Sequence, residues 1–508
     1  MRRQGSVFYN TLALTAVDLL LRGLGVLFQR WLSGQIGAAG IGLLQLVGSV
    51  GGLAMTLGLS GIRTTAMYLC AEEHGAGRLG GVRRAVRLCL GYTLVCSVLA
   101  AALLLFSADT LARAWLHAPQ TAPALRLLAI GLPLRCALSV CAGYFTACGG
   151  LRRLIAAEVA EQLAAALLSA LLLRMWAGTD GARAICALTA AGLLAALLPA
   201  IWLGWTLRRE LRACGAPEDA GLFRRMLRLC LPLALGEYLR TGLRTLEQLL
   251  IPRGLARFAR AEGQGLAAYG TICGMVFPIL MLPAAPLFAL SELLVPELAR
   301  CRAVGGQARI RRICRRSLRL GLLYAACVGA LLYLSAPELG ALIYKSGEAG
   351  RYLRLFAPLT PMLYADAIVD AMCKGLRQQT RCVRNNTITS VLDVALLYVL
   401  LPRLGVRGYL ISFTVTHAVN FYLSLVLLLN AAQWTVRWGF ALRLGVSVAA
   451  PAALCMYLPL QSGAPAAVLR CAVFLVLHLL LARGLALPDK GERAWLGRTL
   501  RDGGRNAA

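Results

Sequence analysis

The sequence has little of what soluble proteins and most enzymes need. Only 15% of its 508 residues are charged and four are histidine, whereas 59% are apolar. So little polar surface cannot cover a water-soluble fold, and we predict an all-α, polytopic membrane protein. The absence of a Walker A motif argues against a built-in ATPase. The histidines and cysteines show no metal-ligand spacing, so no metal site is expected.

The sequence also lacks C-x-x-C cysteine pairs and has few acidic residues. None of the 17 cysteines forms a C-x-x-C pair, and most lie in apolar stretches, where Cys serves as a small, reduced packing residue. Asp and Glu number 23 against 53 Lys and Arg, for a net charge of +30. The basic residues lie between apolar stretches, which fits an anionic leaflet surface better than nucleic acid. We therefore expect membrane lipids as partners and no nucleic-acid partner.

One long apolar run dominates the pattern. Residues 266–290 contain no charge and three prolines, at positions 278, 283 and 286. Such a run can cross a hydrocarbon core of about 30 Å, and its prolines bend the helix and free backbone carbonyls. Those features are tolerated where a helix is buried or lines a cavity, which is typical of transporters rather than simple anchors.

An earlier stretch repeats part of this region at a fixed displacement, from position i to position i+228. Gly37, Ala39 and Gly42 align with Gly265, Ala267 and Gly270 in this register. The segments 125–133 and 353–361 align at the same displacement. Two matches in one register indicate an internal duplication. Each repeat is expected to contain six of the transmembrane spans given below. Because six is an even number, both repeats would have the same orientation in the membrane.

We predict about 14 transmembrane helices, the first retained as a signal anchor. The loop 299–319 carries eight arginines, and the charge bias puts it and the amino terminus in the cytoplasm. The predicted organisation is a six-helix lobe at 1–228, a second at 229–430, and two extra helices with a basic tail at 431–508. The expected spans are 8–32, 41–69, 86–106, 124–147, 154–173, 184–207, 229–251, 266–294, 317–335, 353–373, 385–401, 408–430, 439–459 and 466–486.

Several charges fall inside these spans. Each costs at least about 2.5 kcal/mol at mid-bilayer, so it should face protein or water. Arginines suit a phosphate-bearing ligand, because guanidinium binds phosphate as a bidentate fork. Carboxylates could titrate or bind a coupling cation. The candidate substrate-binding residues are Arg22, Arg63, Arg240 and Arg244, and the candidate charge network is Asp18, Glu237, Glu247, Asp366 and Asp370.

A structural interpretation of these charges stays open. Asp18 and Arg22 are four residues apart, and Glu237 and Arg240 are three apart, so each pair could form a neutralising intrahelical salt bridge. Arg63 is harder to explain in this way, because its own helix has no acidic residue at i±4.

Particular segments resemble a known family. The stretch GAAGIGLLQLV (37–47), the motif LVPELA (294–299), the segment 353–379 and LPRLGVRGY (401–409) are similar to bacterial polysaccharide-export flippases. They look most like the stage V sporulation protein B group, relatives of the lipid II flippase in the MATE-like MOP superfamily. The resemblance implies two six-helix lobes and alternating access. Arg22 lies where lipid II flippases carry a first-helix arginine, and a second arginine expected a turn or two later has no clean match.

The expected function is therefore a flippase, not an enzyme, for a lipid-pyrophosphate-linked oligosaccharide or peptidoglycan precursor. We expect a monomer in the plasma membrane, with no cofactor beyond a coupling H⁺ or Na⁺, and a role in spore cortex or cell-wall polysaccharide synthesis. One alternative is a drug/cation antiporter of the same fold. Another is a membrane glycosyltransferase or polymerase, which would need a large extracytoplasmic catalytic loop.

Overall fold

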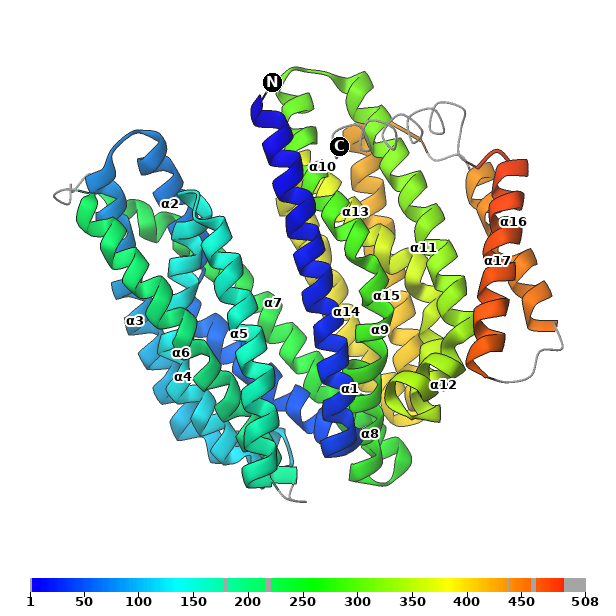
Figure 1. Cartoon of the computed structure of the whole chain (residues 1–508), viewed down its shortest axis with the longest axis horizontal. Helices are drawn as coiled ribbons and strands as arrows, with labels where there is room; N and C mark the ends of the chain where they lie inside the picture. Colours follow the sequence, from blue (N-terminus) through cyan, green and yellow to red (C-terminus); the bar gives the residue numbers. More distant parts are fainter. Residues whose placement is uncertain (1, 178–180, 215–220, 436–437, 458–462, 488–508) are drawn as a thin grey trace. The chain divides into compact units, whose positions relative to one another are not determined.

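The structure is a computed structural model, drawn in Figure 1. It describes residues 2–177, 181–214, 221–435, 438–457 and 463–487, with side chains from Leu19 onward except at positions 151, 177, 262, 303 and 438. Every regular element in these ranges is helical. The α-helices are α1 (Arg2–Leu59), α2 (Ile62–Gly75), α3 (Leu79–Thr110), α4 (Ala122–Ala147), α5 (Leu151–Leu172), α6 (Gly181–Ala213), α7 (Leu222–Ala259), α8 (Glu262–Thr271), α9 (Phe277–Met281), α10 (Ala285–Ala303), α11 (Gln307–Tyr344), α12 (Gly347–Phe356), α13 (Thr360–Gly375), α14 (Gln379–Leu404), α15 (Val406–Ala432), α16 (Trp438–Tyr457) and α17 (Ala464–Gly484).

Twelve helical segments of the described chain are long and apolar enough to cross a membrane. One of them, Leu19–Gly75, has 57 residues, far more than a single crossing needs. It bends at Gly37, whose φ of 69° and ψ of 177° are not helical. The charged helix α7 is not among the twelve. The all-α polytopic fold is thus confirmed, whereas the count of 14 spans stays a prediction.

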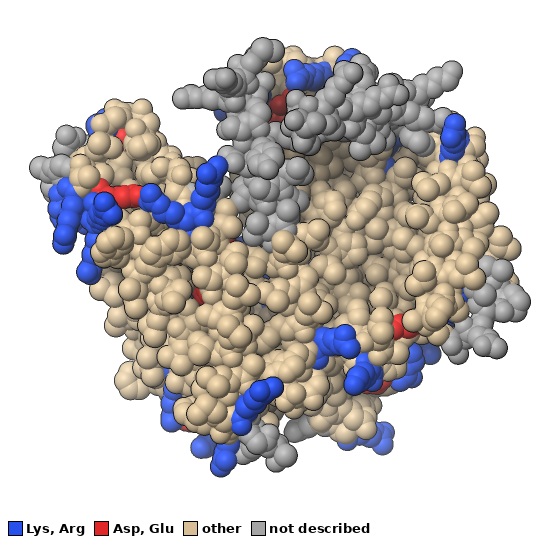
Figure 2. Space-filling model, in the orientation of Figure 1, with Lys and Arg blue, Asp and Glu red and all other residues tan. Residues whose placement is uncertain are grey.

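The surface agrees with a membrane environment. On the face drawn in Figure 2, Lys and Arg gather at the ends of the helices and a broad middle band is nearly free of charge. Large apolar side chains are exposed along the helices, among them Leu20 (73%), Phe106 (89%) and Ile201 (71%). In water such a surface would aggregate, but in a bilayer it contacts lipid.

Contacts divide the chain into two compact units. Unit 2 comprises residues 35–270, and unit 1 comprises residues 1–34 and 271–508. The predicted lobe boundary at position 228 follows the sequence repeat, and the contacts group the chain differently. The first part of α1 belongs to unit 1, and α7 belongs to unit 2.

The repeat appears in the helix ends. Helix α2 ends at Gly75 and α10 at Ala303, while α3 begins at Leu79 and α11 at Gln307, so both boundaries recur from position i to position i+228. The same displacement relates the ends of α4 and α13 and the starts of α5 and α14. The internal duplication expected from sequence is therefore seen in the secondary structure.

Inside unit 2 the two copies of one motif pack on each other. A Cβ on Gly42 would lie 2.3 Å from the carbonyl oxygen of Leu266, and a Cβ on Gly270 would lie 2.0 Å from that of Ala38. Ala38 and Leu266 are related by the repeat displacement, as are Gly42 and Gly270, so the contact is nearly two-fold symmetric. Only glycine lets the backbones of α1 and α8 approach this closely.

The proline-rich run is bent as predicted. Between α8 and α10 the chain passes through a π-helix (Ile272–Val276), the short α9 and a 3₁₀ turn (Leu282–Ala284). The carbonyl of Leu280 accepts a hydrogen bond from the Tyr364 hydroxyl, and the carbonyl of Pro283 accepts one from Tyr324 at 2.7 Å. Neighbouring helices thus satisfy backbone groups at the break.

Helices α16 and α17 form a hairpin against α11 within unit 1 (Figure 1). Arg470 of α17 donates a hydrogen bond of 3.0 Å to Glu338 of α11, and both side chains are largely buried. His478 of α17 lies 2.9 Å through Nδ1 from the carbonyl oxygen of Ser447 on α16. The basic tail expected after position 487 lies outside the described residues.

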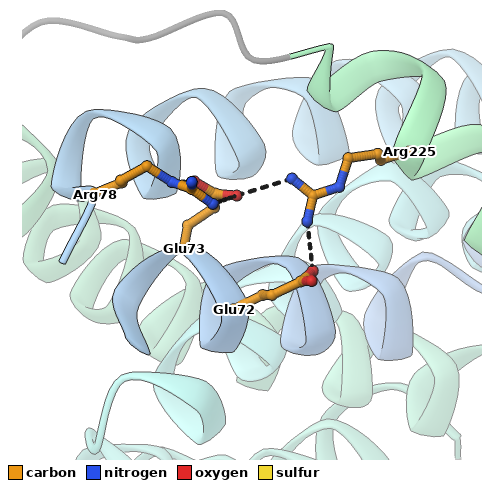
Figure 3. Close-up of polar contacts among 4 residues, drawn as sticks. All are labelled: Glu72, Glu73, Arg78 and Arg225. Carbon is orange, nitrogen blue, oxygen red and sulfur yellow. Dashed lines mark hydrogen bonds and ion pairs between the residues drawn. The ribbon is translucent and has the colours of Figure 1, made fainter. Parts of the chain in front are cut away.

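A buried carboxylate joins three segments of unit 2 (Figure 3). Glu73, whose side chain is fully buried at the end of α2, accepts two hydrogen bonds from Arg78, at 2.8 and 2.9 Å. Arg225 at the start of α7 donates a third, at 3.0 Å, and also pairs with Glu72 at 2.7 Å. Gly81 lies against this carboxylate, and a Cβ there would be 2.3 Å from Glu73 Oε2, so a larger residue would displace the Glu73 side chain.

Candidate functional site

The position of Arg63 follows from a break between α1 and α2. Ser60 and Gly61 have φ values of 47° and 72°, which end α1 and start α2 just before Arg63. Helix α7 stabilises the break, because Cys230 Sγ lies 2.7 Å from the Ser60 carbonyl oxygen and Tyr238 forms a short hydrogen bond with the Ser60 hydroxyl. The break therefore sets the direction in which α2 presents its arginine.

Arg63 lines a pocket of about 140 Å³ inside unit 2. Arg135 of α4 enters the same pocket, where its Nη1 lies 3.7 Å from Glu161 Oε1 and its Nη2 donates a 2.8 Å hydrogen bond to the Gly192 carbonyl. Glu158 of α5 lines the same pocket as Arg63. The pocket thus holds two guanidinium and two carboxylate groups, a polar site that can bind a charged group.

The charged row on α7 does not line this pocket. Glu237 and Arg240 pair with each other at 2.9 Å, and both side chains are substantially exposed. Arg244 is exposed, while Glu247 is half-buried. The intrahelical pair therefore fits the structural interpretation given above, and a substrate role for Arg240 and Arg244 stays a prediction.

Arg22 belongs to the other unit. Its guanidinium lies 5.2 Å from the centre of the Phe288 ring, a cation–π distance, within unit 1. The side chain of Asp18, its proposed partner, lies outside the described residues. A substrate-binding role for Arg22 therefore stays a prediction.

Unit 1 holds a second polar cluster, on α13 and α15. Asp366 accepts a 3.1 Å hydrogen bond from the Asn420 amide, and Asp370 forms an ion pair of 2.7 Å with Lys374. Both aspartates are half-buried. The four-residue spacing along α13 places them on one face of the helix.

Nearby, Asp393 of α14 is buried and absent from the candidates chosen from sequence. Its Oδ1 accepts hydrogen bonds from Ser412 at 2.8 Å and from Thr416 at 3.1 Å, both on α15. Arg135 was likewise missed. Each is an ionisable residue inside an apolar span, and that signal could have found both.

A large groove in unit 1 is almost purely apolar. It has a volume of about 1060 Å³ and lies between α11, α15 and α16. A few isolated polar side chains interrupt its apolar wall, among them Asn430, Thr435 and Tyr333. Its size and chemistry suit a hydrocarbon chain. The lining includes Leu322, Ala326, Leu425, Phe440, Leu444 and Val448.

These features define a class: a polytopic transporter with intramembrane charges and an apolar groove. The fold resembles an inward-facing multidrug MATE transporter of the MOP superfamily, with a TM-score of 0.64 and 17% identity, covering 82% of this chain and 94% of that one. It also resembles the lipid II flippase MurJ in an inward closed conformation, with a TM-score of 0.62 and 12% identity, covering 93% and 98%.

The sequence comparisons are more specific. Residues 7–289 match the family described as polysaccharide biosynthesis protein, and the chain belongs to that family. It is 25% identical to stage V sporulation protein B of Bacillus subtilis (strain 168) over 432 residues, which is 83% of this chain and 82% of the relative. The resemblance inferred from the sequence motifs is confirmed, and the protein is a multi-pass membrane protein of the flippase and transporter class.

Proposed function

We propose that the protein flips a lipid-pyrophosphate-linked oligosaccharide or peptidoglycan precursor across the plasma membrane by alternating access. It acts as a transporter and not as an enzyme, so the substrate leaves with its covalent structure unchanged. A role in spore cortex or cell-wall polysaccharide synthesis accords with the similarity to stage V sporulation protein B.

The observation that carries this proposal is the apolar groove of unit 1. A lipid-linked sugar has a long hydrocarbon tail that must stay out of water while its head crosses the membrane. A groove of about 1060 Å³ with an almost purely apolar wall can hold a substantial part of such a tail. Water-soluble sugars would gain nothing from this surface.

Arginines supply the chemistry for the head group. Arg63 and Arg135 line one pocket in unit 2, and Arg22 lies at the Phe288 ring in unit 1. Guanidinium groups keep their charge at every physiological pH and match the geometry of phosphate oxygens. This supports a pyrophosphate-bearing substrate.

Coupling to an ion gradient is part of the proposal. Asp393 presents a buried carboxylate with two hydroxyl groups beside it, and Asp366 of α13 accepts a hydrogen bond from Asn420 of α15. Oxygen groups of this kind can hold Na⁺, and the carboxylates can hold H⁺. The protein works as a monomer, with its amino terminus in the cytoplasm.

The decisive experiment uses purified protein in liposomes with a labelled lipid-linked oligosaccharide. We expect the label to move between leaflets while its mass, measured by mass spectrometry, stays the same. A change of glycan length with no partner enzyme present would instead identify a polymerase.

A drug/cation antiporter is the second candidate, favoured by the likeness to the MATE transporter and by the carboxylates Glu158 and Glu161 in the unit 2 pocket. The same liposomes distinguish it. An antiporter would exchange a fluorescent organic cation for H⁺ or Na⁺ and leave the lipid-linked oligosaccharide in place.

A further inference from the structure

The apolar groove of unit 1 has an arginine at each end. Along α11 its wall runs from Leu318 to Tyr333, a rise of about 22 Å at 1.5 Å per residue, or roughly three-quarters of a hydrocarbon core of about 30 Å. At one end the Arg319 guanidinium lies 4.6 Å from the centre of the Phe440 ring. At the other end the Arg354 guanidinium lies 4.8 Å from the centre of the Tyr333 ring. Both rings line the groove, so each places a cation beside it.

The two arginines differ in what holds them. Arg319 is only 8% exposed, and its Nη2 donates a 2.8 Å hydrogen bond to the Leu487 carbonyl, so it fixes the chain that follows α17. Arg354 of α12 is exposed, and its Nη2 lies 3.9 Å from Met456 Sδ on α16. It forms no ion pair within the part of the chain that the structure describes. A thioether is a weak acceptor, so most of the five guanidinium donors of Arg354 can bind another group.

The internal repeat shows that a carboxylate has been replaced beside Arg354. At the displacement of 228 residues Arg354 corresponds to Arg126, which forms an ion pair of 2.7 Å with Asp109 in unit 2. The position that corresponds to Asp109 is Pro337. The repeat that lines the groove therefore keeps the arginine and lacks the carboxylate that neutralises it in the other repeat.

The acidic side chains that lie near Arg354 in the sequence have partners of their own. Glu338 of α11 accepts a 3.0 Å hydrogen bond from Arg470 of α17. Glu348, at the start of α12, lies 3.8 Å from Arg351 in an ion pair. An anion that balances Arg354 would thus come from outside this part of the chain.

We propose that Arg354, stacked on Tyr333, binds the phosphate of a polyprenyl-linked substrate whose hydrocarbon chain lies in the groove. The arginine-rich loop 299–319 lies at the opposite end of α11 and is predicted to be cytoplasmic, so Arg354 holds the head group on the side where the substrate is released. The inference rests on the proposed function, which supplies the polyprenyl chain and its phosphate.

The physical reason is that one ligand satisfies both the groove and the cation. A guanidinium binds two phosphate oxygens as a bidentate fork, and the bond is stronger beside an apolar wall than in water. The hydrocarbon chain gains free energy by leaving water. The structural alternative is that Arg354 extends to the membrane surface and contacts only water and lipid. Such an anchor would not distinguish a phosphate from an alcohol on the same chain.

The test compares two labelled ligands that differ only in the head group, a polyprenyl phosphate and the polyprenol of equal chain length. Binding is measured with the purified protein in nanodiscs. Arg354→Gln should weaken binding of the phosphate by about tenfold or more, as expected for a lost hydrogen bond between charged groups, and leave binding of the alcohol unchanged. Arg354→Lys should restore phosphate binding in part, because ammonium keeps the charge and lacks the fork. Unchanged binding of the alcohol also shows that the variant is folded.

Arg126→Gln is the matched control, because it changes the corresponding arginine of unit 2 and should bind both ligands as the native protein does. Ala449→Trp narrows the groove from its wall and should weaken binding of both ligands. A photoreactive group beside the phosphate locates the head group. It should cross-link to residues 333–361 of the native protein, with a lower yield in Arg354→Gln.

Three results would overturn the inference and leave the proposed function intact, provided that the native protein flips its substrate. The first is phosphate binding by Arg354→Gln that equals native binding. The second is an equal loss of phosphate and alcohol binding in both Arg354→Gln and Arg354→Lys, which would make Arg354 a structural residue. The third is head-group cross-linking that misses residues 333–361. Absence of both binding and flipping in the native protein would reject the proposed function itself.

Discussion

At the scale of single residues, the charges inside the membrane fall into two groups. Some are paired on their own helix, such as Glu237 with Arg240 and Asp370 with Lys374. Others meet across helices, as Arg135 and Glu161 do. Pairs of the first kind are predictable from a spacing of three or four residues, whereas pairs of the second kind depend on how helices pack. Only the second kind lines the unit 2 pocket.

The buried Glu73 should be among the most sensitive positions of unit 2. Glu73→Ala leaves Arg78 and Arg225 without their shared carboxylate, and breaking a buried pair in this way costs about 3–5 kcal/mol. Glu72→Ala is the control, because Glu72 is exposed and exposed pairs contribute about 0–1 kcal/mol. Unfolding of the purified protein in detergent, followed by circular dichroism, measures both. Equal stability of the two variants would contradict a structural role for the buried carboxylate.

Arg63 is a predicted substrate residue that lines the unit 2 pocket. Arg63→Ala should abolish flipping while the protein still reaches the membrane, and Arg63→Lys should restore it in part, because ammonium keeps the charge and lacks the planar fork. Arg126→Ala, at an exposed ion pair, should flip normally. If Arg63 only neutralises Glu158, the double variant Arg63→Ala, Glu158→Ala would regain full transport, and that outcome would exclude substrate binding.

At the scale of helices, glycine and proline decide where each element bends and how closely two elements approach. Gly37 bends α1, and Ser60 with Gly61 separates α1 from α2. Proline in the run 278–286 produces a break whose carbonyls are bound by tyrosines of other helices. The bends follow from local sequence, whereas their hydrogen-bond partners come from distant segments.

The paired glycines of α1 and α8 give a test at this scale. Gly42→Ala or Gly270→Ala places a methyl group against a backbone oxygen, and overpacking of this kind costs about 1–3 kcal/mol. Gly48→Ala is the matched control on α1, since a Cβ there meets nothing within 4 Å and alanine favours a helix by roughly 0.5–1 kcal/mol. Thermal unfolding should separate the variants. A Gly270→Ala protein as stable as Gly48→Ala would show that α8 can move away freely.

At the scale of the whole chain, sequence reasoning predicted the helical class, the bend of the proline-rich run and the repeat, because these depend on composition, on proline and on a single alignment register. The break at Ser60 and Gly61 was not predicted, and it falls inside the expected span 41–69. In the structure the ends of α2 and α10, and those of α4 and α13, are separated by the same 228 residues. The pocket itself could not be predicted. Arg135 and Glu161 are held together by the packing of α4 and α5, and no local spacing reports a contact between separate helices.

Orientation in the membrane is the remaining prediction for the whole chain, and α11 offers a direct test of it. The helix has 38 residues, or about 57 Å at 1.5 Å per residue, so it is long enough to place its two ends on opposite sides of the membrane. Gly306 precedes it in the arginine-rich turn, and Gly347 follows it at the start of α12. Both positions can accept a side chain, since a Cβ at Gly306 meets nothing closer than 3.4 Å and one at Gly347 meets nothing within 4 Å.

Because arginine-rich loops are retained in the cytoplasm, Gly306→Cys should be shielded from an impermeant thiol reagent in whole cells and Gly347→Cys should be labelled. The native cysteines are all buried or half-buried, so the unmodified protein should give a low baseline. Opening the cells should make Gly306→Cys reactive, which shows that the thiol is accessible once the reagent can reach it. Labelling of Gly306→Cys in intact cells, with Gly347→Cys shielded, would invert the orientation and put the eight arginines of 299–319 on the outer face.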